Sequence, residues 1–253
     1  MNRNKGQILC STAVNLLFPR RCPVCDEAVR PFGVLICREC EEKLLPKALS
    51  EKDALCCRCG KPLSDPGAEF CGDCEGVRSF YVKGCAAYRY RDVSGALYRL
   101  KYEGRAEYAE WMGDQMAGRI LEEFGRVGAD MLMPIPISKE REKKRGYNQA
   151  ALLAERISRT TGIPVNQDCL VRKTDTAVLR SMGALDRRNK IKNAFIASGV
   201  DVKSKIIMLI DDIYTTGATV DTCAEKLMEK GAAAVYCAVL AIGEDSCTQG
   251  QRR

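Results

Sequence analysis

The chain has 253 residues, of which 40 are Lys or Arg and 33 are Asp or Glu, so its formal net charge is +7. A moderate basic excess suits phosphorylated ligands or nucleic acid as partners. The sequence contains no histidine, which excludes Cys-His and Ser-His nucleophilic arrangements and removes the commonest general base. Any chemistry must therefore rely on carboxylates, lysines, a bound metal ion or the positioning of substrates.

No apolar run approaches the roughly 18 residues that span a bilayer. The apolar segment at residues 8–18 is interrupted by polar residues, and we interpret it as a short helix rather than a secretory signal. We therefore expect a cytoplasmic protein without membrane insertion.

The 15 cysteines are concentrated near the N-terminus, with ten of them between Cys10 and Cys74. Eight form four Cys-x2-Cys pairs, and each member of the last two pairs lies 34 residues after its counterpart in the first two. This spacing indicates an internal duplication, and it selects Cys56 over its neighbour Cys57. The eight paired cysteines are Cys22, Cys25, Cys37, Cys40, Cys56, Cys59, Cys71 and Cys74.

Four thiolates in two close pairs suit a tetrahedral zinc ion. Disulfides are the alternative, but Cys-x2-Cys pairs make poor structural disulfides and a reducing compartment disfavours them. We predict two structural zinc sites, most simply paired in chain order, although a cross-braced arrangement uses the same residues. The module serves either as a rigid mini-domain or as a docking surface for protein or nucleic acid. We expect Cys10, Cys85, Cys169, Cys223 and Cys237 to be ordinary core residues.

After Cys74 the hydrophobic pattern alternates between strands and helices over about 170 residues. This alternation predicts one α/β domain with a mainly parallel sheet at residues 80–253, preceded by the double zinc-binding module at residues 1–79. We predict strands at residues 81–90, 130–136, 166–171, near 195, 206–210 and 235–241, and helices at residues 92–102, 105–124, 147–161 and 220–230.

A buried strand, an acidic pair and a small hydroxyl-rich loop follow one another in residues 206–219. The loop should lie where a strand ends and a helix begins, so backbone amides and the helix dipole favour an anion there. The segment thus predicts a phosphate site beside two carboxylates that accept hydrogen bonds from sugar hydroxyls; a surface turn after a core strand is the alternative. The acids are Asp211 and Asp212, and the loop is Thr215, Thr216, Gly217, Ala218 and Thr219.

This segment resembles the phosphoribosyl-pyrophosphate (PRPP) motif of type I phosphoribosyltransferases. The resemblance implies a phosphoribosyltransferase-like fold in which Asp211 and Asp212 hold the ribose 2- and 3-hydroxyls and the threonine loop holds the 5-phosphate. It also implies Mg²⁺ carried mainly by the ligand. The oxocarbenium-like transition state of such enzymes needs charge stabilisation and positioning more than a histidine base.

Other motifs resemble the ComF family, which comprises competence-associated, phosphoribosyltransferase-like proteins. They are Pro134-Ile135-Pro136, a basic stretch over Lys139–Arg145, Arg-Gly-Tyr-Asn-Gln beginning at Arg145, and Leu-Lys-Tyr-Glu-Gly at residues 100–104. With the cysteines, the resemblance covers nearly the whole chain.

The ComF resemblance implies that Arg145 lies near the pyrophosphate end of the site. A second basic stretch at residues 180–192 would form a mobile hood that carries Arg187 towards phosphate. Family members usually carry glutamine where Leu179 stands and asparagine where Lys190 stands, a departure that bears on catalysis.

Two functions remain as alternatives. The first is a phosphoribosyltransferase with an unknown acceptor, in which Asp211 and Asp212 are catalytic. The second is a non-catalytic protein that binds PRPP or single-stranded DNA during natural competence, with other competence proteins as partners and with bases stacked on Tyr90, Tyr102 and Tyr147. Turnover of PRPP, against salt-sensitive DNA binding without turnover, distinguishes the two.

Overall fold

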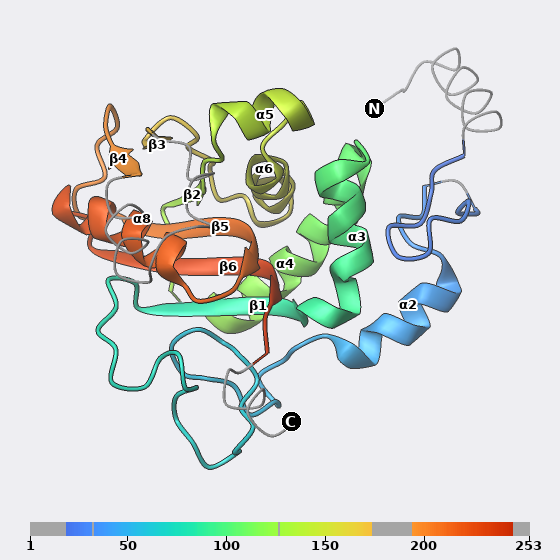
Figure 1. Ribbon diagram of the computed structural model, residues 1–253, viewed down its shortest axis with the longest axis horizontal. Coiled ribbons are helices and arrows are strands. Elements are labelled where there is room, and N and C mark those ends of the chain that lie inside the picture. Colours follow the sequence, from blue (N-terminus) through green and yellow to red (C-terminus); the bar gives the residue numbers. More distant parts are fainter. Residues whose placement is uncertain (1–18, 32, 126, 174–193, 245–253) are drawn as a thin grey trace, which may run out of the picture.

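A four-stranded parallel sheet forms the centre of the computed structural model, which describes residues 19–31, 33–125, 127–173 and 194–244 (Figure 1). The strand order is β1-β6-β5-β2, and each neighbouring pair is parallel. The predicted α/β class with a mainly parallel sheet is thereby confirmed. The strands are β1 (Lys83–Arg89), β2 (Met131–Pro134), β5 (Ile206–Tyr214) and β6 (Ala234–Ile242).

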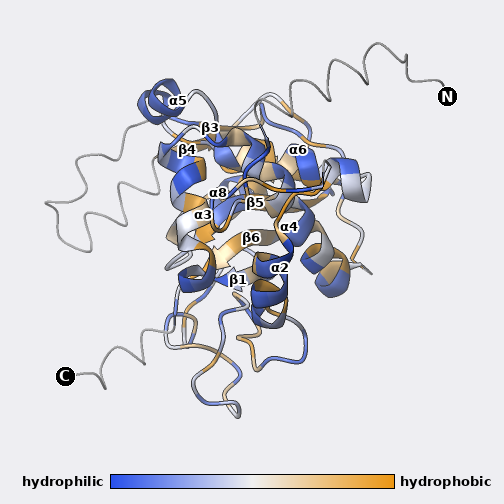
Figure 2. Ribbon diagram, turned by 90° about the vertical axis from the view of Figure 1, so that its right-hand side faces the viewer, coloured by the Kyte–Doolittle hydropathy of each residue, from blue (hydrophilic) through white to orange (hydrophobic). Residues whose placement is uncertain are grey.

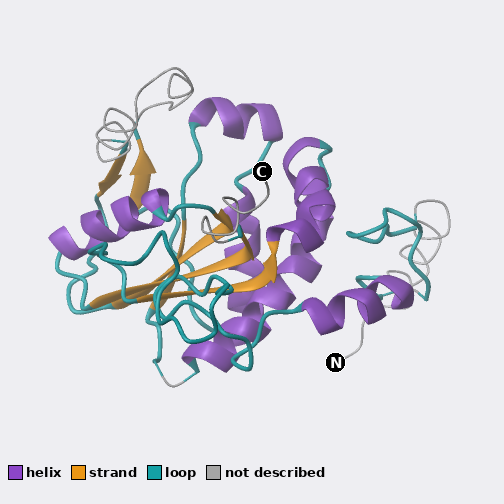
Figure 3. Ribbon diagram, turned by 60° about the horizontal axis from the view of Figure 1, so that its bottom comes forward, coloured by secondary structure: helices purple, strands orange, loops and turns teal. Residues whose placement is uncertain are grey.

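Helices cover both faces of this sheet (Figure 3). Both faces of β5 are consequently buried: Met208 and Ile210 pack with the helices of one face, and Ile207 and Leu209 with those of the other. This explains why β5 is a continuous apolar run rather than an alternating one. One face carries α3 (Tyr90–Tyr102), α4 (Ala109–Phe124) and α6 (Gln149–Thr161), and the opposite face carries α8 (Ala218–Glu229).

The connections of β2 and β5 leave the sheet on opposite sides. The chain from β2 to β5 passes through α6 on one face, whereas β5 continues through α8 on the other. Because neighbouring parallel strands whose connections diverge leave a crevice at their carboxyl ends, the space beyond β2 and β5 is the favoured place for a ligand. The topology therefore selects one edge of the sheet for function.

The structure differs from the sequence-based expectation in three respects. β5 extends to Tyr214 rather than ending at Ile210, because β6 continues to pair with it as far as Ile242. The expected strands near residues 170 and 195 form a separate antiparallel pair, β3 (Leu170–Arg172) with β4 (Phe195–Ala197), instead of joining the main sheet.

The third difference is the first basic stretch, for which the sequence pattern predicts neither helix nor strand and which forms helix α5 (Lys139–Arg145). Ser138 caps its N-terminus by accepting a hydrogen bond from the Arg141 amide, and Gly146 ends it in the left-handed conformation. The helix buries no residue and is hydrophilic along its length (Figure 2). A helix without an apolar face leaves no hydrophobic periodicity in the sequence, so the pattern did not predict it.

The cysteine-rich N-terminal segment docks on the α/β domain at two places. Its first half contacts the helical face, where Arg99 donates to the carbonyl of Val24 at 3.1 Å. Its second half lies below β1 in Figure 1, and there the amide of Gly84 donates to the carbonyl of Arg58 at 2.6 Å. Between them run α2 (Arg38–Leu44) and the short 3-10 helix η1 (Leu45–Lys47).

The cysteines predicted to be core residues follow the prediction wherever the structure describes them. Cys85, Cys169, Cys223 and Cys237 are buried in the core, as expected. Expectations for Cys10, the helix at residues 8–18, Leu179, Arg187 and Lys190 fall outside the described residues. Among the helices that are described, none combines the length and the apolar character that crossing a bilayer requires.

Gly84→Ala should lower the free energy of unfolding by about 1–3 kcal/mol, the usual cost of overpacking. An added Cβ would lie 2.8 Å from the Cys237 sulfur and 3.4 Å from the carbonyl oxygen of Cys59, between sheet and cysteine-rich segment. Gly118→Ala in α4 is the matched control: nothing lies within 4 Å of the added methyl, so alanine should raise helix stability by about 0.5–1 kcal/mol. Urea unfolding measures both, and equal stabilities would contradict the close packing.

Candidate functional site

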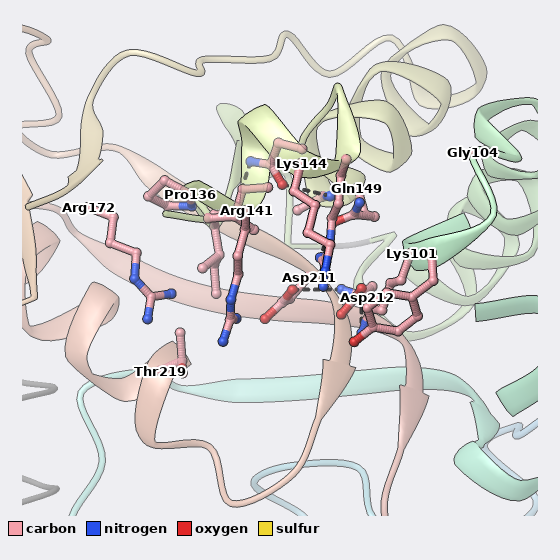
Figure 4. Close-up of a pocket in the computed structure, with 16 residues that line it drawn as sticks. Lys101, Gly104, Pro136, Arg141, Lys144, Gln149, Arg172, Asp211, Asp212 and Thr219 are labelled. Carbon is pink, nitrogen blue, oxygen red and sulfur yellow. Dashed lines mark hydrogen bonds and ion pairs between the residues drawn. The ribbon is translucent and has the colours of Figure 1, made fainter. Parts of the chain in front are cut away.

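A cavity of about 520 Å³ opens at the carboxyl end of the sheet, in the crevice beyond β2 and β5 (Figure 4). Of the predicted site residues, Asp211, Asp212, Thr219 and Arg145 line it, together with six further charged or amide side chains. These further residues are Lys101, Arg141, Lys144, Asn148, Gln149 and Arg172.

The two acids lie within β5, past the point where β2 stops pairing with it at Ile210. Successive side chains of a strand point to opposite faces, so Asp212 shares the face of Ile210, and Asp211 that of Leu209. Both carboxylates nevertheless line the same cavity, because no strand among the described residues pairs with this edge of β5 beyond β2.

Asp212 forms an ion pair with Lys101, which belongs to the last turn of α3. The Nζ atom of Lys101 lies 2.8 Å from a carboxylate oxygen of Asp212, and both side chains are largely buried, with 16% and 12% exposed. Lys101 therefore neutralises one of the two carboxylates and fixes its orientation towards α3.

Asp211 has no equally close cation among the described residues, and its carboxyl lies at the floor of the cavity. Burial raises the pKa of Asp211 to about 7, and the neighbouring charge of Asp212 adds to the rise. A hydrogen bond of 2.8 Å from the Asp212 amide and the charges of Lys101 and Arg172 act in the opposite direction on this pKa. The site thus holds one carboxylate that is paired with Lys101 and one whose pKa is raised towards neutral pH.

Helix α5 supplies a basic wall above the acids. Arg141, Lys144 and Arg145 stand three and four residues apart, on one side of the helix, and all three line the cavity (Figure 4). Opposite them, Arg172 at the end of β3 also lines the cavity and lies with its guanidinium 5.2 Å from the ring centre of Phe195. Together with Lys101 of α3, cations from three elements line the cavity that holds the acidic pair, a distribution suited to a polyanionic ligand.

The Arg-Gly-Tyr-Asn-Gln motif connects α5 to α6 and orients Arg145. Asn148 caps α6 by accepting from the Ala150 amide at 3.1 Å, and its own amide donates to the carbonyl of Ile135. Arg145 donates to the side-chain oxygen of Gln149 at 2.7 Å. The Nε2 atom of Gln149 is buried and has no hydrogen-bond partner within the described part of the chain; it borders the cavity, so a ligand acceptor would satisfy it.

The threonine loop contributes less side-chain surface to the cavity than the sequence suggests. Thr215 and Thr216 are exposed and lie outside the cavity lining, whereas Thr219 lines it. Gly217 adopts φ = +78° and precedes α8, which begins at Ala218. The first amides of a helix have no intrahelical partner, so this turn offers backbone donors rather than hydroxyls to an anion.

Arg172 is not among the residues that the sequence predicts for the site. It belongs to a three-residue strand that is separate from the main sheet, and no motif marks it. The sequence indicated Lys101 only weakly as a site residue, because it is the second residue of the Leu-Lys-Tyr-Glu-Gly segment. Only the packing of α3 beside β5 shows that its partner is Asp212. Arg187, predicted for the hood, lies outside the described residues.

The eight paired cysteines form two clusters in chain order. The four sulfur atoms of each cluster lie within 4.8 Å of one another. The Sγ atoms of Cys25 and Cys37 are 3.8 Å apart, and those of Cys59 and Cys71 are 3.6 Å apart. A tetrahedral zinc ion with Zn–S bonds of about 2.3 Å requires sulfurs roughly 3.8 Å apart. The donor sets therefore fit two structural zinc ions. Cys57 is exposed and belongs to neither cluster.

Comparison with known proteins identifies the family. A model of the double zinc ribbon domain matches residues 13–75. The competence protein ComFC of Bacillus subtilis (strain 168) is 35% identical over 212 residues, which are 79% of this chain and 80% of that protein. The chain belongs to the ComF family of competence proteins. The resemblance seen in the sequence is thereby confirmed.

Other relatives extend the comparison. The DNA utilization protein YhgH of Salmonella typhimurium is 26% identical over 224 residues, covering 87% of this chain and 96% of that protein. A purine phosphoribosyltransferase from Pyrococcus horikoshii is similar in structure over 52% of this chain and 74% of that chain, with a TM-score of 0.34 and 18% identity. That score is too low to support a conclusion.

This ComF protein, purified under reducing conditions, should contain close to two equivalents of zinc, because each cluster supplies a complete set of four thiolates. Elemental analysis of the purified protein measures the metal, and thiol titration before and after chelation counts the ligands. Intramolecular disulfides in place of metal would contradict both sites.

Asp211→Asn should be more stable than the wild-type chain above about pH 7, and the difference should shrink towards about pH 5.5. In the unfolded chain this carboxyl ionises near 3.8, whereas in the folded chain its pKa is raised to about 7. Because the folded state holds the proton longer, wild-type stability falls as pH rises between these values, whereas that of the variant does not. Urea unfolding at several pH values measures the difference. A gap that does not depend on pH would show that burial leaves Asp211 unperturbed.

Proposed function

We propose that this ComF protein binds phosphoribosyl pyrophosphate with Mg²⁺ and transfers the phosphoribosyl group to an acceptor. The observation that carries the proposal is the meeting of two carboxylates, a helix N-terminus and cations from three elements in one cavity at the diverging connections of β2 and β5. A phosphorylated sugar with a second polyanionic group matches each of these features. In this proposal residues 80–253 form a phosphoribosyltransferase-like domain and residues 1–79 a structural zinc module.

The 5-phosphate would bind at the start of α8. Gly217 brings the backbone close to the anion without a side chain, the amides of Ala218 and Thr219 are free of intrahelical partners, and the Thr219 hydroxyl lines the cavity. Thr215 and Thr216 would contribute through their backbone, since their exposed side chains lie outside the lining.

The ribose would lie over the acidic pair. Asp211 and Asp212 face the cavity as hydrogen-bond acceptors, which suits two vicinal hydroxyl donors. Lys101 holds Asp212 in place. The ionised form of Asp211 accepts better than the neutral acid, so hydroxyl binding and ionisation of this residue favour each other.

The pyrophosphate would lie against α5, where Arg141, Lys144 and Arg145 face the cavity. Bound Mg²⁺ would neutralise part of the pyrophosphate charge. In the reaction, the bond between the anomeric carbon and the pyrophosphate oxygen breaks and its electron pair leaves with pyrophosphate. The acceptor forms a bond to the same carbon and releases a proton to solvent. These cations stabilise the departing charge, a task that requires no histidine.

Binding of single-stranded DNA is a second candidate. It is favoured by α5, which exposes its cations, and by the exposed ring of Tyr102, which lies 5.2 Å from the Arg145 guanidinium at the cavity rim. Cations that follow a phosphate backbone next to exposed aromatic rings are typical of single-strand binding. The names of two relatives, a competence protein and a DNA utilization protein, agree with this candidate.

The test is a calorimetric titration with PRPP and Mg²⁺. Arg145→Gln should weaken binding by about 1.5–3 kcal/mol, because it removes a charge-assisted contact. Arg159→Gln removes the same charge from the exposed end of α6, outside the cavity lining, and should leave the affinity nearly unchanged. Equal affinities of the two variants would contradict the site.

A second arm of this experiment separates the two candidates. Release of pyrophosphate on addition of a nucleobase or an amine indicates transfer. Binding of single-stranded DNA that weakens steeply with salt, is displaced by PRPP and is lost in Arg145→Gln, with no pyrophosphate release, indicates the DNA-binding function.

A further inference from the structure

The two cysteine clusters have the same ligand pattern, yet they contact different parts of the α/β domain. The first cluster packs with the core on the side of α3 and α4, and the second packs with the core on the side of α8. The second cluster and the segment that follows it reach the turn between β5 and α8, which is the proposed phosphate-binding turn. Three contacts make this connection.

The first contact is between two buried tyrosines. Tyr81, which follows the second cluster, shares a hydrogen bond of 2.7 Å with Tyr214, the last residue of β5. The Tyr214 hydroxyl lies against Gly217: a Cβ built on Gly217 would be only 2.1 Å from it. The side chain of Tyr214 therefore lies beneath the turn, and Tyr81 fixes where its hydroxyl sits.

The second contact is a buried lysine. Lys61 lies two residues after Cys59, is 1% exposed and pairs with Asp73 at 2.5 Å. Asp73 lies between Cys71 and Cys74, so this ion pair connects the two cysteine pairs of the cluster. The Nζ atom of Lys61 also donates to the carbonyl of Thr215 at 3.4 Å, across 154 positions of sequence.

The third contact fixes the start of α8. One oxygen of the Asp221 carboxylate accepts from the Ser79 hydroxyl and from the Phe80 amide, each at 2.7 Å. Asp221 belongs to the first turn of α8. The segment leaving the second cluster is thereby attached to the helix whose N-terminus faces the cavity.

We propose that the second cysteine cluster is part of the phosphate site, with Tyr81 and Lys61 as positioning residues that hold the β5–α8 turn in its anion-binding geometry. The turn is exposed at Thr215 and Thr216 and contains a left-handed glycine, so it gains little rigidity from its own side chains. Contacts that order it before the ligand arrives reduce the entropy lost on binding. Metal in the second cluster, and not in the first, then controls anion affinity. This inference rests on the proposed function for its ligand, but not for the rigidity of the turn.

The first experiment compares Tyr81→Phe with Tyr88→Phe in the full chain. Each substitution removes one hydrogen bond of a buried tyrosine hydroxyl, and Tyr88 donates its own to Gln115 at 2.7 Å, away from the turn. Tyr81→Phe should speed amide hydrogen exchange at residues 213–222 and weaken PRPP binding roughly three- to tenfold, the effect of one hydrogen bond. Tyr88→Phe should change neither quantity. Unchanged exchange at this turn in Tyr81→Phe would overturn the proposal.

Substitutions of Lys61 test the same proposal independently of Tyr81. Lys61→Met removes the charge at similar length and should produce the same two changes, whereas Lys61→Arg keeps the cation and should restore affinity at least in part. Melting temperatures recorded for all variants identify a merely global loss of stability, which would speed exchange throughout the chain rather than at the turn. That uniform result would also overturn the proposal.

The cluster itself is tested with Cys71→Ser and its repeat-related control, Cys37→Ser. Each should lose one zinc equivalent, but only Cys71→Ser should release the turn and lower anion affinity. Equal effects would refute the distinction; if Cys71→Ser does not fold, Tyr81→Phe and Lys61→Met decide. A further outcome is a wild-type chain that binds no PRPP, while the amides of the β5–α8 turn still exchange faster in these variants than in the wild type. That result would refute the proposed ligand and retain the positioning role of the second cluster.

Discussion

The early end of β2 is the constraint on which the rest of the site depends. β2 pairs with β5 only as far as Ile210, whereas β6 accompanies β5 to Tyr214. Within the part of the chain that the structure describes, residues 211–214 therefore have a strand neighbour on one side alone, and the chain after β2 turns away through Ile135 to α5. Had β2 continued, it would fill the crevice and cover both acids. The cavity is thus a consequence of unequal strand lengths at the point where the connections diverge.

The two carboxylates of this cavity have different electrostatic surroundings, and the difference comes from their positions in the fold rather than from the net charge of the chain. Lys101 forms an ion pair with Asp212. Asp211 lies in a position where burial disfavours the charged form of its carboxyl. Because a buried carboxylate lowers the stability of the folded chain near neutral pH, packing alone does not explain an acidic residue at this position. The cations of α5 and β3 line the same cavity, but none of them forms a close ion pair with the Asp211 carboxylate among the described residues. An anionic ligand with hydroxyl donors satisfies the cations and the carboxylates simultaneously.

The two cysteine clusters show how a duplicated motif comes to have two different sets of neighbours. A four-thiolate cluster lets a segment with few apolar residues fold, since metal binding replaces much of the core that it lacks. Once folded, each ribbon presents different flanking residues to the α/β domain. The first presents Asp26 to Tyr108, and the second presents Lys61 and Tyr81 to the β5–α8 turn. The cysteines of the two clusters occupy equivalent positions of the 34-residue repeat, whereas the residues around the two clusters differ.

The sequence by itself determined the features that are encoded locally. The 34-residue repeat selected the eight clustered cysteines, the apolar run before Asp211 predicted a buried strand, and the helical pattern at residues 220–230 placed the hydroxyl-rich loop at the start of a helix. Each of these follows from the spacing or the pattern of residues within one short segment. The α/β class followed similarly, because alternating strands and helices favour parallel pairing.

Tertiary structure alone decided which distant residues meet. α5 has no apolar face and so no periodic signal, and Arg172 belongs to a strand too short to be placed from sequence. The pairing of Lys101 with Asp212 depends on how α3 packs beside β5. Thr215 and Thr216 directly follow the end of β5 at Tyr214 and are exposed outside the cavity lining, which the sequence pattern did not indicate. Local patterns specify elements, whereas the order of strands and the side on which each connection runs specify the site. Those depend on packing free energy summed over the whole core, which no short segment contains.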